Sequence, residues 1–227
     1  TNFKMNFHST LTSWYSVNKR SLPWRGSKNP YNIWLSEIIL QQTQIKQGLP
    51  YYEAFLSNYP SVQALAEASE TEILNLWQGL GYYSRARNLH FTAKHITENL
   101  NGEFPKSYKS LLELKGVGDY TASAIASICY EEAVAVVDGN VYRVLARYFG
   151  IETPINSTEG IKQFKALAQS LLPLSNFGDY NQAVMEFGSQ QCKPQSPNCE
   201  LCPLASSCKA YATGSIKILP VKLKKTK

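Results

Sequence analysis

The sequence LLELKGVGDYTA, residues 111–122, places Gly116, Val117 and Gly118 between two segments of helical character. The two glycines allow a tight turn and a close approach of the backbone to a ligand. The helix predicted from Asp119 then begins with unpaired N–H groups and the positive end of its dipole, which suit a phosphate group. The same pattern also fits an ordinary helix–helix turn, so it needs support from the rest of the chain.

The composition is that of a packed intracellular protein. The chain has 227 residues, of which 44% are hydrophobic and 18% charged, enough for one large domain or two lobes. No apolar stretch reaches the roughly 20 residues that span a bilayer, and the start lacks the apolar core of a signal peptide. The net charge is +6, but four of the 23 basic residues lie in the tail 221–227 (Lys222, Lys224, Lys225, Lys227). Charge alone therefore permits nucleic-acid binding without establishing it.

Helical periodicity dominates the chain, and no alternating strand pattern is convincing. Ser69 and Ser84 are predicted as helix caps. The apolar segment 133–137 has strand propensity, but we interpret it as extended chain before a helix. The predicted helices are 8–20, 31–47, 51–58, 62–66, 70–78, 84–99, 107–115, 119–130, 140–149, 158–172 and 181–190.

Four of the five cysteines lie within 17 residues near the end of the chain, in the pattern C-x6-C-x2-C-x5-C. They are Cys192, Cys199, Cys202 and Cys208. Without a secretory signal, clustered cysteines indicate metal rather than disulfides. The spacing suits zinc or an iron–sulfur cluster and does not separate the two. Cys129 stands alone on an apolar helix and is interpreted as a core residue.

Two carboxylates have contrasting surroundings. Glu37 lies in an apolar helix, where burial would raise its pKa, although it also fits the edge of a solvated face. Asp138 ends an apolar run just before a helix, where the dipole and N–H groups would favour its ionised form. Either Asp138 or Asn140 could simply cap that helix. Opposed pKa shifts are typical of an acid paired with a stabilising anion.

Several motifs in order resemble adenine DNA glycosylases of the MutY type, in the endonuclease III or helix-hairpin-helix superfamily. The resemblance covers about residues 11–221. It is carried by residues 22–25, 30–31, 34–37, 40–44, 79–89, the hairpin at 111–122, 137–143, 181–183 and the four cysteines.

This resemblance implies an all-α, two-lobed fold with a [4Fe–4S] cluster held by the four cysteines. One lobe, residues 23–132, would be a six-helix bundle containing the hairpin. The other would join residues 1–22 to 133–208 and carry the cluster, and residues 209–227 would form a linker or tail.

The resemblance also implies roles for single residues. Glu37 would protonate adenine, Asp138 would stabilise the sugar cation, and Asn140 would orient Asp138. Gln42 and Tyr82 would wedge into the duplex, although Tyr82 could instead be a core aromatic. The positions that would line a pocket for the extruded adenine are Trp24, Arg25, Leu40, Gln42, Ile45 and Glu186, with Trp24 also interpretable as a packing residue after Pro23.

Tyr120 occupies the position where strand-cutting relatives carry a lysine, and a phenol cannot form a Schiff base. The resemblance therefore predicts a monofunctional enzyme whose partner is double-stranded DNA with adenine opposite 8-oxoguanine or guanine. A monomer is expected.

Three other functions remain open on this scaffold: a thymine–guanine mismatch glycosylase, a bifunctional lyase and a non-catalytic DNA-binding module. Two residues depart from the superfamily hairpin pattern. Lys115 replaces proline and would favour phosphate binding, whereas Asp119 would oppose it. The last residues resemble a linker to a C-terminal 8-oxoguanine-recognition domain, so weaker preference for 8-oxoguanine is expected of this chain.

Overall fold

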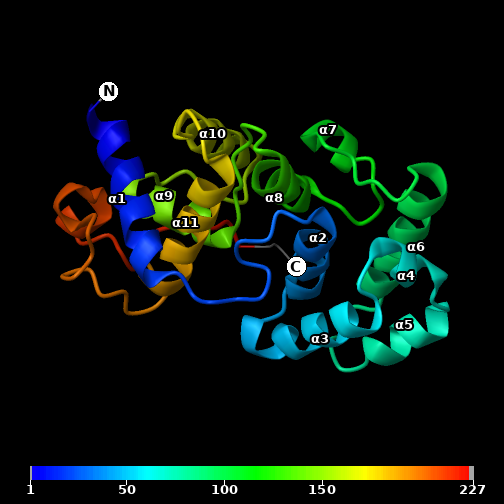
Figure 1. Cartoon of the computed structure of the whole chain (residues 1–227). Coiled ribbons are helices and arrows are strands. Elements are labelled where there is room, and N and C mark those ends of the chain that lie inside the picture. The colour runs from blue at the N-terminus through cyan, green and yellow to red at the C-terminus, as the bar shows by residue number, and fades with distance from the viewer. Residues whose placement is uncertain (1, 225–227) are drawn as a thin grey trace. The chain divides into compact units, whose positions relative to one another are not determined.

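A computed structural model describes residues 2–224, with side chains from Asn6 onward, and these residues form helices without a β-strand (Figure 1). The all-α expectation is confirmed. The helices are α1 Asn2–Asn18, α2 Pro30–Leu40, α3 Ile45–Asn58, α4 Val62–Glu67, α5 Glu70–Leu76, α6 Ser84–Asn99, α7 Tyr108–Leu111, α8 Asp119–Tyr130, α9 Gly139–Phe149, α10 Thr158–Ser170, α11 Phe177–Gln190, the 3-10 helix η1 Ala205–Ser207 and α12 Lys209–Ala212.

The chain divides into two compact units. One joins the residues up to Ser21 with those from Ala133 onward, and the other is Leu22–Glu132. The first boundary lies one residue from the predicted one. The two units are called the terminal unit and the central unit below, and each is described by itself.

Helix α2 forms the middle of the central unit. Its apolar side chains, including Trp34 and Leu35, are buried, and the helix contacts α3, α6 and α8. Helix α8 buries small residues such as Ala122, Ser123 and Ala126 on its packed faces, which lets neighbouring helices approach closely. Asn29 begins α2 by accepting a hydrogen bond from the Tyr31 backbone, and proline occupies the first helical position.

The single helix predicted over 31–47 is wrong. Helix α2 ends at Leu40, and α3 begins at Ile45. Between them Gln42 has φ +55, in the left-handed region, which ends a right-handed helix. The apolar periodicity continues through this break because Leu40 and Ile45 each belong to a helix, and this continuity concealed the turn. Gln41 and Gln44 therefore do not share a helix face with Glu37.

Other helix limits moved by smaller amounts. Ser69 forms the predicted cap, with reciprocal hydrogen bonds to Glu72, but Tyr83 rather than Ser84 stands at the cap of α6. The helix predicted over 107–115 is one turn, Tyr108–Leu111, followed by tight turns that lead into the hairpin.

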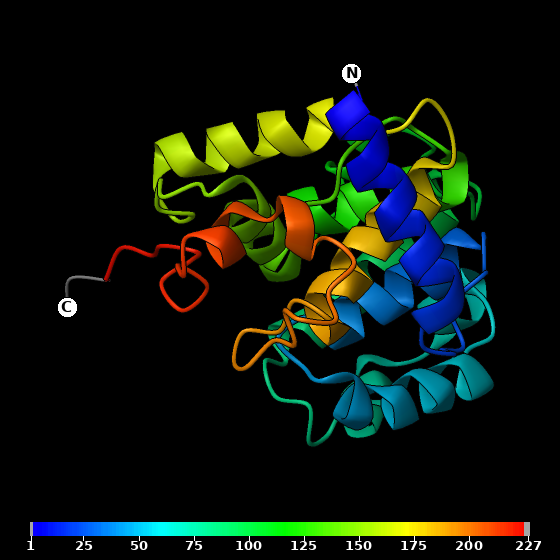
Figure 2. The same ribbon diagram turned by 90° about the vertical axis from the view of Figure 1, so that its left-hand side faces the viewer.

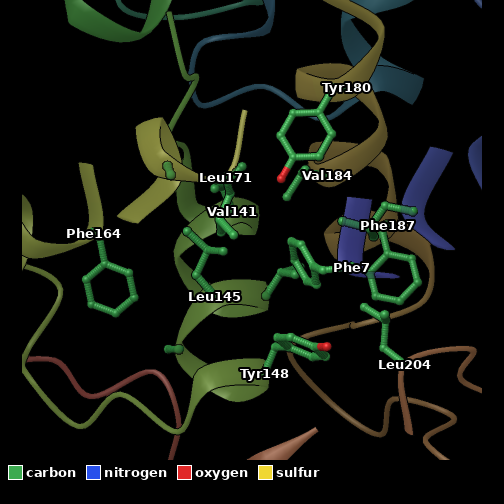
Figure 3. Packing of buried hydrophobic residues seen from close by; sticks show 14 of the residues in the cluster. Phe7, Val141, Leu145, Tyr148, Phe164, Leu171, Tyr180, Val184, Phe187 and Leu204 are labelled. Atoms are coloured by element: carbon green, nitrogen blue, oxygen red, sulfur yellow. The ribbon is translucent and has the colours of Figure 1, made fainter. Parts of the chain in front are cut away.

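The terminal unit is built around α9, whose neighbours are α10, α11 and α12. Helix α1 lies along α11, as Figures 1 and 2 both show. Phe7 from α1 enters the core and lies 4.6 Å from the ring of Tyr148 (Figure 3). Leu145 and Phe187 belong to the same buried cluster. This packing fixes the N-terminal end of α9, where Asp138 lies.

Residues 133–137 are extended, as predicted, and side chains satisfy their backbone. The Asn181 side chain accepts a hydrogen bond from the Val136 N–H at 3.1 Å and donates one to the Val134 carbonyl at 2.8 Å. Gln169 pairs in the same way with Ala135 and Ala133. These amides replace the partner strand that the segment lacks, so its position is set by α10 and α11.

Residues 209–224 pack onto the terminal unit instead of forming a free linker or tail. Leu219 is buried, and its carbonyl accepts a hydrogen bond from Arg147 Nε at 3.0 Å. The Ile155 N–H donates to the carbonyl of Val221, and Asn156 bonds the backbone of Leu223 twice. The prediction of a linker or tail was wrong for residues 209–224 because hydrogen bonds from distant residues hold the backbone of this polar segment. Lys222 and Lys224 are exposed, while Lys225 and Lys227 lie outside the described residues.

Candidate active site and iron–sulfur loop

Asp138 caps α9, and both of its carboxylate oxygens accept hydrogen bonds. Oδ1 accepts from the Val141 N–H at 2.8 Å, and Oδ2 accepts from Asn140 Nδ2 at 2.7 Å. The next residue is Gly139, where an added Cβ would meet nothing within 4 Å. Capping and a chemical role are therefore compatible, because the carboxylate is held firmly and the neighbouring Gly139 leaves its own Cβ position open.

Burial raises the pKa of Asp138, and this effect exceeds the lowering by the hydrogen bonds from Val141 and Asn140 and by the charge of Arg143. The expectation that the helix start would favour the ionised form identified the correct donors but not the net direction. Desolvation dominates because the carboxylate is largely enclosed by the protein.

Asn140 links Asp138 to the loop that follows α11. Its Oδ1 accepts a hydrogen bond from Arg143 Nη2 at 2.7 Å, and the same nitrogen donates to the Gly188 carbonyl at 2.6 Å. Arg143 Nε donates to the carbonyl of Cys192 at 2.7 Å. A Cβ at Gly188 would lie 2.7 Å from Asn140 Cβ, so glycine is required for this contact. Sequence reasoning missed the contacts of Arg143 with Gly188 and Cys192, which lie 45 and 49 residues further along the chain.

The four cysteines of the C-terminal cluster line one pocket and are free thiols. The pKa of Cys202 rises to about 11, mainly because the thiol is buried and in part because of the neighbouring cysteines. Four thiolates in one loop therefore need a positive group between them. Among residues 2–224, no three His, Cys, Asp or Glu side chains lie close enough to hold a single ion. Four thiol donors that line one pocket suit either zinc or an iron–sulfur cluster.

Arg147 joins this loop to the rest of the terminal unit. Its buried guanidinium donates to the carbonyls of Lys193 at 2.6 Å and Pro194 at 3.0 Å, besides that of Leu219. Nη1 also lies 3.5 Å from Cys192 Sγ. One side chain thus holds the start of the cysteine loop and the C-terminal segment against α9.

Glu37 lies on the third turn of α2 in the central unit. It is partly buried between the buried Ser36 and Ile38, so it is not on a fully solvated face. It lies near Cys129 of α8, since its charge helps to raise the pKa of that thiol to about 12, after burial as the main cause. Cys129 is half-buried and not a full core residue.

The predicted pocket residues have different environments. Trp24 is buried and packs edge-on against the ring of Tyr52 at 5.0 Å, as its packing interpretation expected. Arg25, Leu40 and Ile45 are partly exposed in the central unit.

Glu186 belongs to the terminal unit and is 1% exposed. It forms a bidentate ion pair with Arg20, with both N–O distances 2.7 Å, and accepts a hydrogen bond from Gln190. This pairing, which the sequence did not predict, fixes the end of α1 against α11.

Gln42 and Tyr82 are exposed and share an unusual backbone conformation. Tyr82 is 65% exposed, which excludes its interpretation as a core aromatic. Their φ values are +55 and +46, in the left-handed region. Both side chains are therefore presented to solvent by strained loops of the central unit.

The hairpin has the predicted form. Gly116 has φ +80, Val117 is buried, and Gly118 precedes α8. Asp119 accepts a hydrogen bond from the Tyr108 hydroxyl at 2.6 Å, and this bond is the main reason why the pKa of Tyr108 rises to about 12. Lys115 Nζ lies 4.4 Å from the centre of the Phe91 ring.

Tyr120 is half-buried in the first turn of α8, a helix without lysine. The position therefore offers a phenol and no amine.

Comparison with known proteins identifies the family. A model of the HhH-GPD superfamily base excision DNA repair proteins matches residues 35–170. The chain belongs to this superfamily. The iron–sulfur binding domain of endonuclease III matches residues 192–208, which identifies the cysteine loop as a [4Fe–4S] site.

Relatives and a solved structure agree with this assignment. The chain is 40% identical to an adenine DNA glycosylase of Buchnera aphidicola (subsp. Baizongia pistaciae) and 45% identical to that of Homo sapiens, over 97% and 90% of its own length. It spans 62% and 39% of the lengths of these relatives. A thermostable thymine-DNA glycosylase has a TM-score of 0.85 at 30% identity, covering 92% of this chain and 97% of that one.

No helix within residues 2–224 is long and apolar enough to cross a membrane.

Proposed function

We propose that this chain is a monofunctional adenine DNA glycosylase that hydrolyses the N-glycosidic bond of adenine opposite 8-oxoguanine or guanine. The observation that carries the proposal is the Asp138 carboxylate, held by two hydrogen bonds beside the open position at Gly139. The names of the relatives in Buchnera and human support adenine as the base. The chain would act inside the cell, where its DNA substrate lies, and as a monomer.

The reaction needs an acid at the base and an anion at the sugar. Glu37 donates its proton to a ring nitrogen of adenine, and the electron pair of the N-glycosidic bond leaves with the base. The sugar becomes an oxocarbenium ion, which the Asp138 carboxylate stabilises. Water adds to the anomeric carbon and loses a proton, leaving an abasic sugar.

Asn140 orients Asp138 through the 2.7 Å hydrogen bond and lowers the pKa that burial raises. The Asp138 carboxylate must be ionised to stabilise a cation, so Asn140 extends its working range to lower pH. Arg143 fixes the Asn140 side chain by donating a hydrogen bond to its Oδ1 at 2.7 Å.

Tyr120 makes the enzyme monofunctional in this proposal. No amine in the first turn of α8 can attack the sugar, so the strand stays intact after base release. The abasic site breaks only when alkali is added.

DNA binding would combine backbone and base contacts. At the hairpin, the N–H groups of Gly116 and Gly118 would bind a phosphate, whereas the Val117 N–H donates to the Leu114 carbonyl at 3.1 Å and sets the turn. Gln42 and Tyr82 would enter the duplex and take up the space of the extruded adenine. Trp24, Arg25, Leu40 and Ile45 would contact that base, and Glu186 would support its pocket through Arg20.

The [4Fe–4S] cluster, when bound to Cys192, Cys199, Cys202 and Cys208, supplies a crosslink that stabilises the loop after α11. The chain's own residues carry out base excision.

Single-turnover base release from duplexes with adenine opposite 8-oxoguanine, adenine opposite guanine, and thymine opposite guanine tests the proposal. Adenine release that needs alkali for strand breakage, and that Asp138→Asn abolishes while DNA binding persists, is the expected result. Thymine release alone would instead assign the activity of the thymine-DNA glycosylase whose fold is so similar. Release of neither base, with DNA binding and cluster intact, would refute catalysis.

A further inference from the structure

Two loops of the central unit converge on one partly buried arginine, Arg85. Gln42 lies on the loop after α2, and Tyr82 lies on the loop before α6. Both residues are exposed and have left-handed backbone angles. Residues other than glycine adopt this conformation at a cost in free energy, so neighbouring contacts must hold it.

Arg85, in the first turn of α6, bonds to both loops. Its Nη1 donates to the backbone carbonyls that end α2, and its Nη2 donates to those of the second loop. The Nη1 distances are 3.1 Å to Ile38, 3.0 Å to Ile39 and 2.6 Å to Gln41, and the Nη2 distances are 3.2 Å to Leu80 and 3.4 Å to Gly81. The cation thus supplies donors to the carbonyls at the C-terminal end of α2, where the helix dipole places partial negative charge.

The flat faces of the same guanidinium contact aromatic rings. Its central carbon lies 5.1 Å from the Trp77 ring centre and 5.7 Å from that of Tyr82. Trp77 is fully buried, and its Nε1 donates to the Gly81 carbonyl at 2.9 Å. Arg85 therefore connects a fixed aromatic platform to the exposed Tyr82 ring.

We propose that Arg85 is a positioning residue that holds Gln42 and Tyr82 in the conformation that enters the duplex and extrudes the base. The inference rests on the proposed function. The new element is the Arg85 guanidinium, a single cation that contacts the loops of both Gln42 and Tyr82.

Arginine is required for this geometry. Its planar fork sends donors to two loops while its faces stay free for stacking, whereas the ammonium of lysine is a single point charge. Arg87 offers a matched control, because it lies on the same helix but is exposed and pairs with Glu70 at 3.5 Å.

The experiment compares Arg85→Lys, Arg85→Gln and Arg87→Gln in the full chain. Stopped-flow fluorescence of 2-aminopurine placed beside the mispaired adenine reports base extrusion, and single-turnover assays report adenine release. Loss of several charge-assisted hydrogen bonds predicts a slowing of extrusion by about 10- to 100-fold for the Arg85 variants. Their affinity for undamaged duplex should change little, their unfolding temperature should fall by a few degrees because backbone carbonyls lose a donor, and Arg87→Gln should match the wild type.

The decisive comparison repeats Arg85→Lys in a Gln42→Ala/Tyr82→Ala background. If Arg85 acts through these residues, the added substitution changes the extrusion rate by less than about twofold. The same loss in both backgrounds would overturn the inference. A folded Arg85→Lys or Arg85→Gln variant with wild-type extrusion would also overturn it.

Fluorescence separates this inference from the proposed function. If the wild type extrudes the base but releases none, the proposed catalysis fails, and slower extrusion in the Arg85 variants still supports the positioning role. If the wild type does not change the fluorescence, there is no wedge to position and the inference fails.

Discussion

At the level of single side chains, the hydrogen bond from Asn140 opposes the main effect of burial on the pKa of Asp138. Burial raises the pKa of Asp138 and the Asn140 amide lowers it. In the proposed reaction, base release requires the ionised Asp138 carboxylate, so we expect the rate to fall as the pH drops through this pKa.

Replacing Asn140 with alanine removes one donor to the carboxylate, so the pKa of Asp138 rises further. We expect the acid limb of the pH–rate profile to move to higher pH and the rate at neutral pH to fall on the order of tenfold. Single-turnover adenine release across a pH series measures both effects. Asn58→Ala is the control, because Asn58 is exposed and bonds the Ala54 carbonyl within α3. An unchanged acid limb in Asn140→Ala would contradict the orienting role.

The raised pKa of Asp138 also has a consequence for stability. A carboxyl group with a higher pKa in the folded state than in the unfolded state favours folding when it is protonated. This contribution is present below the unfolded value and is lost as the pH rises through the folded value. Ionised Asp138 therefore costs the fold stability at neutral pH, which is typical of a group kept for chemistry rather than for folding.

At the level of elements, the hairpin and α8 carry a negative charge where phosphate binding is expected. Asp119 stabilises the start of α8 and accepts a hydrogen bond from the Tyr108 hydroxyl. Its negative charge would weaken the binding of a DNA phosphate at the same place. We expect Asp119→Asn to bind undamaged duplex a few-fold more tightly at low salt, with a loss of about 0.3–1 kcal/mol in unfolding free energy. Fluorescence anisotropy and thermal unfolding measure these two changes.

Glu159→Gln is the matched control for Asp119→Asn, because Glu159 lies in the first turn of α10. It should lose similar stability without a gain in affinity. Equal affinity of Asp119→Asn and the wild type at low salt would show that Asp119 does not face the phosphate.

The extended segment that leads to Asp138 depends on Asn181. Its amide bonds the backbone of Val134 and Val136 in a buried place. Asn181→Leu removes the amide and leaves both backbone groups unpaired, at about 1–3 kcal/mol each. We expect a lower unfolding temperature and faster hydrogen exchange over residues 133–138, measured by mass spectrometry. Unchanged exchange there would mean that other contacts, such as the Gln169 bonds to Ala133 and Ala135, hold the segment without Asn181.

At the level of the whole chain, Arg147 connects the cysteine loop, α9 and the C-terminal segment. Arg147→Met removes the donor to the carbonyl of the buried Leu219 and to those of Lys193 and Pro194 in the cysteine loop. We expect a loss of about 3 kcal/mol, or about 5–10 °C in unfolding temperature, and faster loss of the cluster's visible absorbance on exposure to a chelator. Arg87→Met, at an exposed arginine, should change neither measurement. Wild-type cluster retention in Arg147→Met would show that the cysteines alone secure the loop.

Local signals in the sequence were sufficient for the hairpin, for α6 and α8 and for the cysteine set. Each depends on residues within about 20 positions, through glycine angles, capping and ligand spacing. The resemblance then identified Asp138 and Asn140 as a pair, which the terminal unit places in contact.

Tertiary structure alone decided the break at Gln42, the ion pair of Arg20 with Glu186, and the packing of residues 209–224. It also decided the contacts of Arg85 and Arg143. Arginine on an amphipathic helix has the same local pattern whether its side chain meets solvent or buried carbonyls. The difference arises from backbone groups that come from distant parts of the chain and must be paired once they are buried. Sequence periodicity records which residues avoid water, and it does not record which buried carbonyl lacks a donor.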